Sequence, residues 1–114
     1  MIIDYNDFEK VDIRLGKIFN VEDFPEAKKP AFKLKIDFGQ EIGVKTSSVQ
    51  AVGAHTKNEL LGMLVVCVVN FAPKRIGAFA SEVLTLGFKN DQGDGWVLIT
   101  PAKSSAVKIG DKLQ

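Results

Sequence analysis

Apolar and polar residues alternate along 11–15 and again along 19–21, which is typical of a strand with one buried face. The apolar side chains stand at the odd positions in both stretches, and the phase breaks between them at Gly16. A glycine at such a break indicates a bulge or a sharp bend within one long strand. We therefore expect residues 11–21 to form a single curved strand, of the kind that helps to close a small barrel.

The clearest strand pattern in the chain is at 32–38, where apolar residues alternate strictly with lysine and aspartate. Gly39-Gln40 follows, and the alternation resumes at Ile42 and Val44. Two alternating stretches separated by a Gly-X pair predict a tight hairpin. Residues 24–30 contain two prolines and two lysines and are expected to form the loop that precedes this hairpin.

The second half of the chain predicts shorter elements. Thr56 with Glu59 three residues later is a capping-box pattern, and Gly62 follows the next two leucines, so we expect a helix of one to two turns there. Pro, Gly, Asn and Asp mark two loops, at 73–77 and 89–95. Further strands are expected at 63–69, 79–86 and 96–99, with a last short edge at 107–109.

Five or six strands with one short helix about midway match the plan of the OB fold. The fold class that we predict is therefore all-β: a five-stranded OB-fold Greek-key barrel with a short helix between strands and small terminal extensions. The chain of 114 residues fits one such domain, spanning 1–114, and its 46% hydrophobic and 25% charged residues are ordinary globular values. Barrels of this kind bind oligonucleotides, sugars or peptides on one face.

Charge and cysteine content narrow the classes of function. The formal net charge is only +1, so a nucleic-acid site would have to be a local basic cluster. The single cysteine, Cys67, lies in the apolar run 63–69 and is expected to be a buried thiol, in keeping with a reducing, cytoplasmic location. No signal-peptide pattern is visible, and no apolar run is long enough to cross a bilayer, so we expect no membrane insertion.

Residues suited to catalysis or metal binding are sparse. His55 is the only histidine, so neither a Cys/His metal cluster nor a histidine-activated nucleophile is expected. Asp91 and Asp94 lie in a glycine-rich segment, where such residues usually stabilise turns. We therefore expect a binding protein that is not an enzyme, with no catalytic residue, no metal and no cofactor.

Basic residues are the more suggestive feature. Lys45 lies on the partner strand of the predicted hairpin, and Lys74 and Arg75 stand together in a later loop. These three can be ordinary surface residues of a solvated barrel. If they converge on one groove beside Phe71 or Phe79, the rings can stack bases and the cations can contact phosphates. The same aromatic and basic groove would equally hold an extended peptide, so the residues themselves leave both partners open.

Several motifs, in order along the chain, resemble one family. Residues 11–18 (VDIRLGKI), 24–27 (FPEA) and 36–39 (IDFG) are similar to the opening of the tRNA-binding domain family, which includes free-standing dimeric tRNA-binding proteins and domains appended to aminoacyl-tRNA synthetases. Residues 45–48 (KTSS), 69–73 (VNFAP), 76–77 (IG) and 81–84 (SEVL) resemble its CsaA branch, described as export-related chaperones. Leu84 replaces a methionine of the synthetase-type domains and Ser48 a glycine, and both departures point toward the CsaA branch.

The resemblance implies an OB-fold homodimer that binds through the Asn-Phe-x-Pro loop and the Ser-Glu strand. The residues expected to bind tRNA or peptide are Lys45, Ser48, Asn70, Phe71, Pro73, Lys74, Arg75, Ser81 and Glu82. The expected partners are tRNA, unfolded or exported polypeptides, and a second copy of the chain. One hypothesis is a tRNA-binding module that also acts as a peptide-binding chaperone. The alternatives are a chaperone with little or no tRNA binding, and a structural dimer with no ligand of its own.

Overall fold

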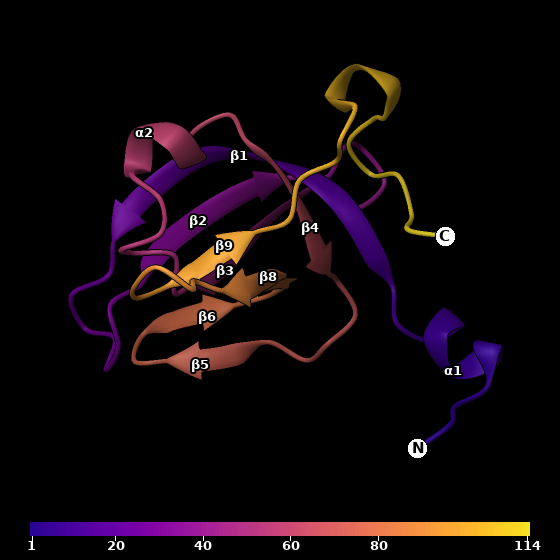
Figure 1. Cartoon of the computed structure of the whole chain (residues 1–114), viewed down its shortest axis with the longest axis horizontal. Coiled ribbons are helices and arrows are strands. Elements are labelled where there is room, and N and C mark those ends of the chain that lie inside the picture. The colour runs from indigo at the N-terminus through magenta and orange to yellow at the C-terminus, as the bar shows by residue number, and fades with distance from the viewer.

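Strands make up most of the regular secondary structure, and the helical segments are short (Figure 1). The computed structural model describes residues 1–114. In chain order the elements are α1 (Tyr5–Glu9), β1 (Ile13–Asp23), β2 (Phe32–Asp37), β3 (Val44–Val49), α2 (Lys57–Leu60), β4 (Leu64–Val68), β5 (Lys74–Ile76), β6 (Phe79–Ser81), β7 (Leu84–Thr85), β8 (Gly87–Lys89), β9 (Trp96–Leu98) and the 3-10 turn η1 (Ser104–Ala106).

The long first strand belongs to two strand pairs. Its residues 13–17 pair with β4 and its residues 17–23 with β2, both antiparallel. The five-stranded sheet has the order β3-β2-β1-β4-β7, and the backbone N–H groups of Glu82 and Val83 donate to the carbonyl of Thr46, which joins its two ends. The sheet therefore closes into the antiparallel barrel of an OB fold, and the predicted fold class is confirmed.

The bend in β1 is present, but Gly16 has a different role from the one predicted. The register with β2 shifts between Ile18 and Asn20, so the bulge lies beyond the glycine. Gly16 is buried, and a Cβ atom there would stand 2.4 Å from Ile36 and 2.7 Å from Phe38. The glycine is required because the core of β2 packs directly against the backbone of β1.

The barrel interior is a continuous apolar core with one polar group of side chains. Its fully buried members include Ile18, Leu34, Ile36, Phe38, Leu60, Val65 and Cys67. The hydroxyls of Ser47 and Thr85 lie 2.8 Å apart within it, and the Cys67 thiol donates to Thr85 Oγ1 at 3.5 Å. The Cys67 thiol is fully buried, as predicted, and this burial raises its pKa to about 12.

The capping box before α2 is confirmed. Thr56 Oγ1 accepts from the Glu59 N–H at 3.1 Å, and Glu59 Oε1 accepts from the Thr56 N–H at 3.3 Å. That backbone hydrogen bond lowers the pKa of Glu59. The helix is a single turn, and it places Leu60 in the core, so α2 covers one end of the barrel (Figure 1).

The loop that connects β2 and β3 is longer than predicted. Its connection is not the Gly39-Gln40 pair alone, because Phe38 donates to the Gly43 carbonyl at 3.0 Å and Gly43 to the Gly39 carbonyl at 2.7 Å. Both glycines have positive φ, of 88° and 82°, which an L-residue rarely adopts. β3 therefore starts at Val44 and not at Ile42.

The predicted strand at 79–86 is wrong, and the predicted loop at 73–77 contains a strand. β5 and β6 form a small separate hairpin in which Lys74 pairs with Ser81. After Ser81 the chain leaves this hairpin to reach β3, and only then does β7 join β4. The change of partner within a few residues breaks the alternation that suggested one strand.

The C-terminal segment also differs from the prediction. The expected edge at 107–109 is absent, and the pairing lies a few residues later: Gly110 donates to the Leu15 carbonyl at 2.7 Å and Leu113 to that of Ile13 at 2.8 Å.

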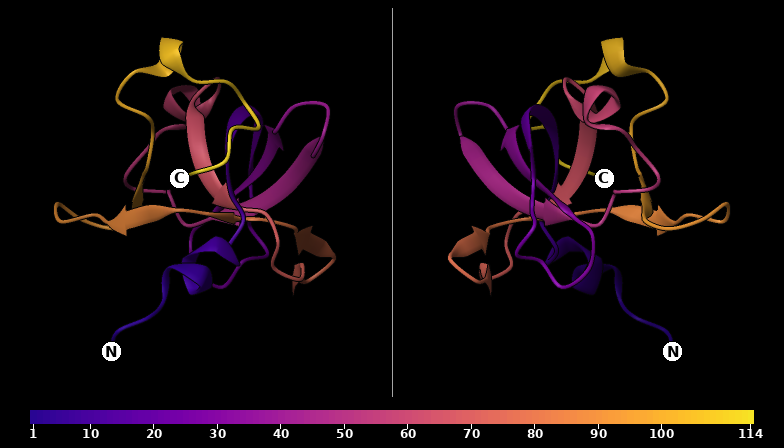
Figure 2. Two further views of the ribbon diagram at one scale, coloured as in Figure 1. Left: turned by 90° about the vertical axis from the view of Figure 1, so that its right-hand side faces the viewer. Right: turned by 90° about the vertical axis from the view of Figure 1, so that its left-hand side faces the viewer.

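Figure 2 shows the β5–β6 and β8–β9 hairpins reaching out on opposite sides of the barrel, with α1 standing clear of it. None of the helices has the length and apolar character needed to span a membrane.

Candidate functional site

A cavity of about 510 Å³ opens beside the closure of the barrel. It is lined by the end of β3, by the loop that leads into β5, by the segment between β6 and β7, and by one side chain from β9. We call this space the apolar cavity, because its lining is mainly apolar. The residues that the argument below uses are Ser48, Gln50, Phe71, Ile76, Glu82 and Trp96.

Two of the predicted site residues, Ser81 and Glu82, line this cavity and also hold the barrel closed. The Ser81 hydroxyl accepts from the backbone N–H of Ser48 at 2.9 Å. Oε1 of Glu82 accepts from the backbone N–H of Thr46 at 3.0 Å and from its hydroxyl at 2.9 Å. Both side chains therefore position β3 against the β6–β7 segment, whatever they contact in a ligand.

Trp96 enters the cavity lining because the β8–β9 turn packs onto the chain after β3. Its backbone N–H donates to the Gln50 carbonyl at 2.7 Å. The preceding residue, Gly95, has φ of +87°, and a Cβ there would stand 2.4 Å from the Val52 carbonyl oxygen. Only glycine permits this approach. Sequence reasoning assigned the tryptophan to a strand and missed its place in the site.

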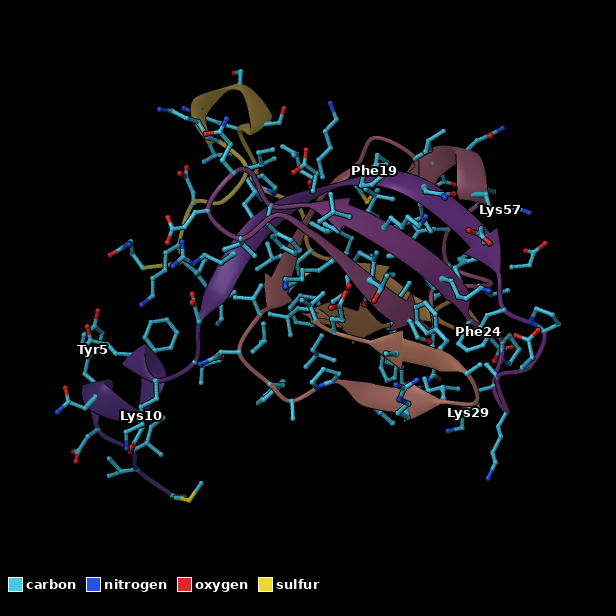
Figure 3. All side chains as sticks on the ribbon, turned by 180° about the vertical axis from the view of Figure 1, so that it is seen from behind. Tyr5, Lys10, Phe19, Phe24, Lys29 and Lys57 are labelled. Carbon is cyan, nitrogen blue, oxygen red and sulfur yellow. The ribbon has the colours of Figure 1, made fainter.

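A second space of about 600 Å³, the basic hollow, adjoins the apolar cavity. The two share four lining residues: Ser48, Gln50, Lys74 and Ile76. The charged residues that line the basic hollow are Lys28, Lys29, Lys74, Arg75 and Glu26. Lys29 lies beside the β5–β6 hairpin in Figure 3. Four cations thus face one carboxylate.

The cations of the basic hollow are not neutralised within the chain. The ion pairs that the structure contains all lie elsewhere, and none involves these four side chains. The one hydrogen bond of the Arg75 side chain is long, from Nη1 to the Ala78 carbonyl at 3.4 Å. The hollow is therefore a local concentration of positive charge on a chain whose net charge is +1.

The predicted site residues are only partly brought together. Phe71 lines the apolar cavity, Arg75 the basic hollow, and Lys74 both. Lys45 and Pro73 line neither, and Lys45 faces Ile36 across the β2–β3 pair. The cations that accompany Lys74 and Arg75 are instead Lys28 and Lys29, which the sequence placed in a loop far away along the chain.

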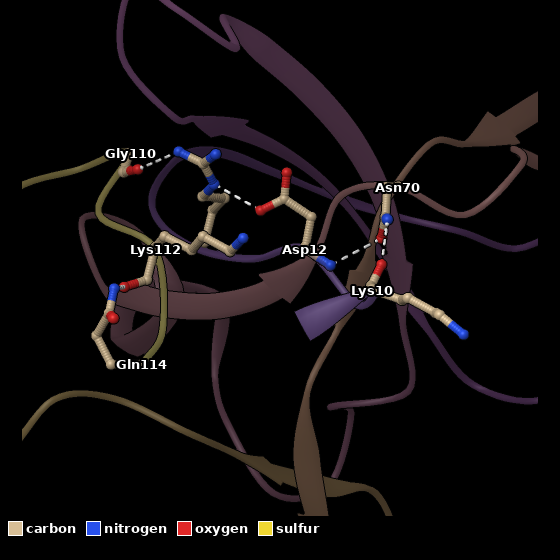
Figure 4. Close-up of polar contacts among 7 residues, drawn as sticks. Lys10, Asp12, Asn70, Gly110, Lys112 and Gln114 are labelled. Carbon is tan, nitrogen blue, oxygen red and sulfur yellow. Dashed lines mark hydrogen bonds and ion pairs between the residues drawn. The ribbon is translucent and has the colours of Figure 1, made fainter. Parts of the chain in front are cut away.

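Asn70 uses its side-chain amide inside the chain (Figure 4). Oδ1 accepts from the Asp12 N–H at 3.0 Å, and Nδ2 donates to the Lys10 carbonyl at 2.8 Å. The neighbouring side chain of Arg14 binds Asp12 through Nε at 2.6 Å, and this bond raises the pKa of Arg14. Asn70 thus fixes the start of the loop that carries Phe71 and does not itself line the cavity.

Phe79, the other aromatic residue considered for the groove, has a different partner. Its ring packs edge-on against Phe24 with the centroids 5.3 Å apart. The ammonium of Lys33 lies over both rings, at 5.5 Å and 5.8 Å from their centroids. This cation–π arrangement joins the loop before β2 to β6 and leaves Phe71 and Trp96 as the aromatic residues of the apolar cavity.

Groups that could carry catalysis are engaged in the fold. His55 Nε2 accepts from the Leu98 N–H at 3.1 Å, and the Cys67 thiol is buried. No group of three or more His, Cys, Asp or Glu residues comes together as a potential metal site. What the surface offers is aromatic contact, unpaired positive charge and a few free polar groups, which is the chemistry of binding.

The chain is similar to a known protein family, to curated proteins and to solved structures. A family model described as a putative tRNA binding domain matches residues 13–112. Among curated proteins, methionine–tRNA ligase of Pyrococcus abyssi is 33% identical over the whole chain, which spans only 15% of the ligase. Among solved structures, a CsaA chaperone protein from Picrophilus torridus is 49% identical with a TM-score of 0.90, covering 99% of this chain and 100% of that one. Chaperone CsaA from Bacillus anthracis is 40% identical with a TM-score of 0.89, and both chains are covered completely.

Proposed function

Since the chain belongs to the tRNA-binding domain family, and its likeness to the CsaA proteins extends over their whole length, we propose that it is a non-enzymatic module that binds tRNA. The observation that carries the proposal is the basic hollow. Its four unpaired cations can neutralise phosphates, and the adjoining aromatic residues can contact bases. A cytoplasmic location goes with this function, because tRNA is found there.

Contact roles follow from the positions of the side chains. Lys28, Lys29, Lys74 and Arg75 bind phosphates, and Ser48 and Phe71 contact the ligand at the cavity. Ser81 and Glu82 shape the cavity by closing the barrel. Asn70 and Pro73 shape the loop that presents Phe71, and Lys45 contributes positive charge from outside the two spaces.

A salt series with bulk tRNA tests the proposal. Log affinity should fall linearly with log salt, and each phosphate contact that is lost should reduce the slope by about 0.7–0.9. Lys74→Ala combined with Arg75→Ala should therefore lower the slope by roughly 1.4–1.8. The control is Lys35→Ala with Lys89→Ala, which removes the same charge from exposed positions outside both spaces. Binding of tRNA that does not respond to salt, or an equal effect of the two double variants, would contradict the proposal.

The apolar cavity supports a second activity, binding of unfolded or exported polypeptides. Phe71 is 55% and Leu84 48% exposed, and both line the cavity. Exposed apolar side chains around a cavity can take up the apolar side chains of an unfolded chain. The test is suppression of aggregation of a denatured client: Phe71→Ala should weaken it, and salt should not, because apolar contacts are not screened. A protein that binds tRNA tightly and leaves aggregation unchanged has no chaperone role.

We also propose that the module is a homodimer. The N-terminal residues Met1, Ile2, Ile3 and Tyr5 are exposed, and α1 stands clear of the barrel (Figure 2). Apolar side chains on a projecting arm are stabilised when a second copy covers them. Light scattering should give twice the chain mass of 12.5 kDa, and a monomeric mass at micromolar concentration would contradict the dimer.

A further inference from the structure

We propose that the apolar cavity and the basic hollow together receive one unpaired nucleotide, with its base in the cavity and its flanking phosphates in the hollow. The inference rests on the proposed binding of tRNA and states which part of such a molecule this surface takes. It concerns a loop, bulge or end with an exposed base, and not the outside of a double helix.

The first reason is that base faces are available only outside a helix. In duplex RNA the bases are stacked on each other, and a protein reaches mainly phosphates and 2′-hydroxyls. Unpaired bases can be splayed out and stacked on aromatic side chains. Phe71 is 55% and Trp96 38% exposed, and both line one cavity whose volume lies in the range of about 300–1,000 Å³ that small-molecule sites occupy. Such a cavity has room for a nucleobase.

The second reason is the continuity of the two spaces. A nucleotide carries an apolar-faced base and a charged phosphate on one sugar, so its site must place aromatic and basic groups side by side. Lys74 and Ile76 line both spaces, while the aromatic residues line the cavity and the other three cations line the hollow. An apolar peptide side chain would use the cavity and leave this concentration of positive charge without a partner.

The third reason lies in the wall between the spaces. Ser48 and Gln50 line both, and neither side chain takes part in a hydrogen bond within the chain, although their backbone groups do. A glutamine amide offers donors and an acceptor, and a serine hydroxyl offers both. These groups can pair with the edge of a base held against the aromatic rings, which is how unpaired RNA bases are read.

The chain carries a built-in reporter for this site, because Trp96 is its only tryptophan. A short unstructured RNA should quench its fluorescence by stacking, and a blunt RNA duplex of the same composition should not. Phe71→Ala should weaken binding of the short RNA by about 5- to 150-fold, the range that base–aromatic stacking contributes. Phe88→Ala is the matched control, since Phe88 is 70% exposed and lies outside both spaces. Thermal melts establish that both variants remain folded.

The outcomes separate this inference from the proposed function. If tRNA binds with a steep salt dependence but the short RNA neither binds nor quenches Trp96, the inference is overturned and the proposed function stands. If an apolar peptide quenches Trp96 and the short RNA does not, the cavity is a polypeptide site and the inference is also overturned. If tRNA does not bind at all, both fall. Quenching by the short RNA alone, lost in Phe71→Ala and kept in Phe88→Ala, supports it.

Discussion

Gly16→Ala should destabilise the barrel without touching the candidate site. The added methyl carbon would stand 2.4 Å from Cγ2 of Ile36 and 2.7 Å from Cε1 of Phe38. Both neighbours are fully buried, at 0% and 1% exposure, so neither can swing into solvent. Overpacking of this kind costs about 1–3 kcal/mol. With an unfolding entropy of about 2.1 cal/mol/K per residue, the melting temperature should fall by roughly 4–12 °C.

The assay is thermal unfolding followed by circular dichroism, with Gly93→Ala as the matched control. Gly93 has its nearest neighbour, Asn90 Nδ2, at 4.0 Å and does not have a left-handed φ. Alanine there should leave the melting temperature unchanged or raise it slightly, because it restricts the unfolded chain. If Gly16→Ala melts at the same temperature as the wild type, the close packing of β1 against β2 is not what requires the glycine.

Three further predictions follow from single contacts. Asn70→Ala should cost about 1–3 kcal/mol for its two hydrogen bonds and speed amide exchange at Asp12, and unchanged exchange would show that the N-terminal segment is held otherwise. His55→Ala should lower the urea midpoint by removing the acceptor of the Leu98 N–H, at a cost of about 1–3 kcal/mol, and an unchanged midpoint would contradict this. The Cys67 pKa rises on folding from 9.0 to about 12, so between these values the unfolded chain binds fewer protons and stability falls as pH rises. The stability advantage of the wild type over Cys67→Ala should therefore shrink by about 1.4 kcal/mol per pH unit in that window, and a constant difference would contradict the burial argument.

The sequence was informative wherever the structure is repetitive or local. β1 and β2 have one face in the core over many residues, so their alternation was visible. The capping box of α2 is a contact over three residues and could be predicted from Thr56 and Glu59 alone. β5 and β6 have three residues each, too few to show a period, and their pairing depends on where the chain turns after Ser81. Such changes of partner are tertiary events that a linear pattern does not record.

The candidate site shows the same division. Phe71, Lys74 and Arg75 lie close together in the sequence, so a groove around them could be foreseen. Lys28 and Lys29 reach the hollow from the loop before β2, and Trp96 reaches the cavity from β9. No local signal marks these residues, because the β2–β3 pairing brings the loop before β2 next to Ser48 and the Trp96–Gln50 hydrogen bond brings β9 there. The family motifs identified Phe71, Lys74 and Arg75, but only the folded structure shows that Trp96, Lys28 and Lys29 lie next to them.

The low net charge of the chain is a weak argument against a nucleic-acid partner. Electrostatic interactions at a surface decay over about 8 Å at physiological ionic strength, so a phosphate responds to the charges around it and not to the sum over the molecule. Several of the 14 acidic side chains have partners elsewhere: Glu82 is held by Thr46, and Asp7, Asp12 and Asp23 form ion pairs away from the hollow. The basic hollow keeps four cations against Glu26. A net charge of +1 therefore coexists with a local concentration of positive charge that favours phosphates, and the salt dependence of tRNA binding reports how many phosphates these cations neutralise.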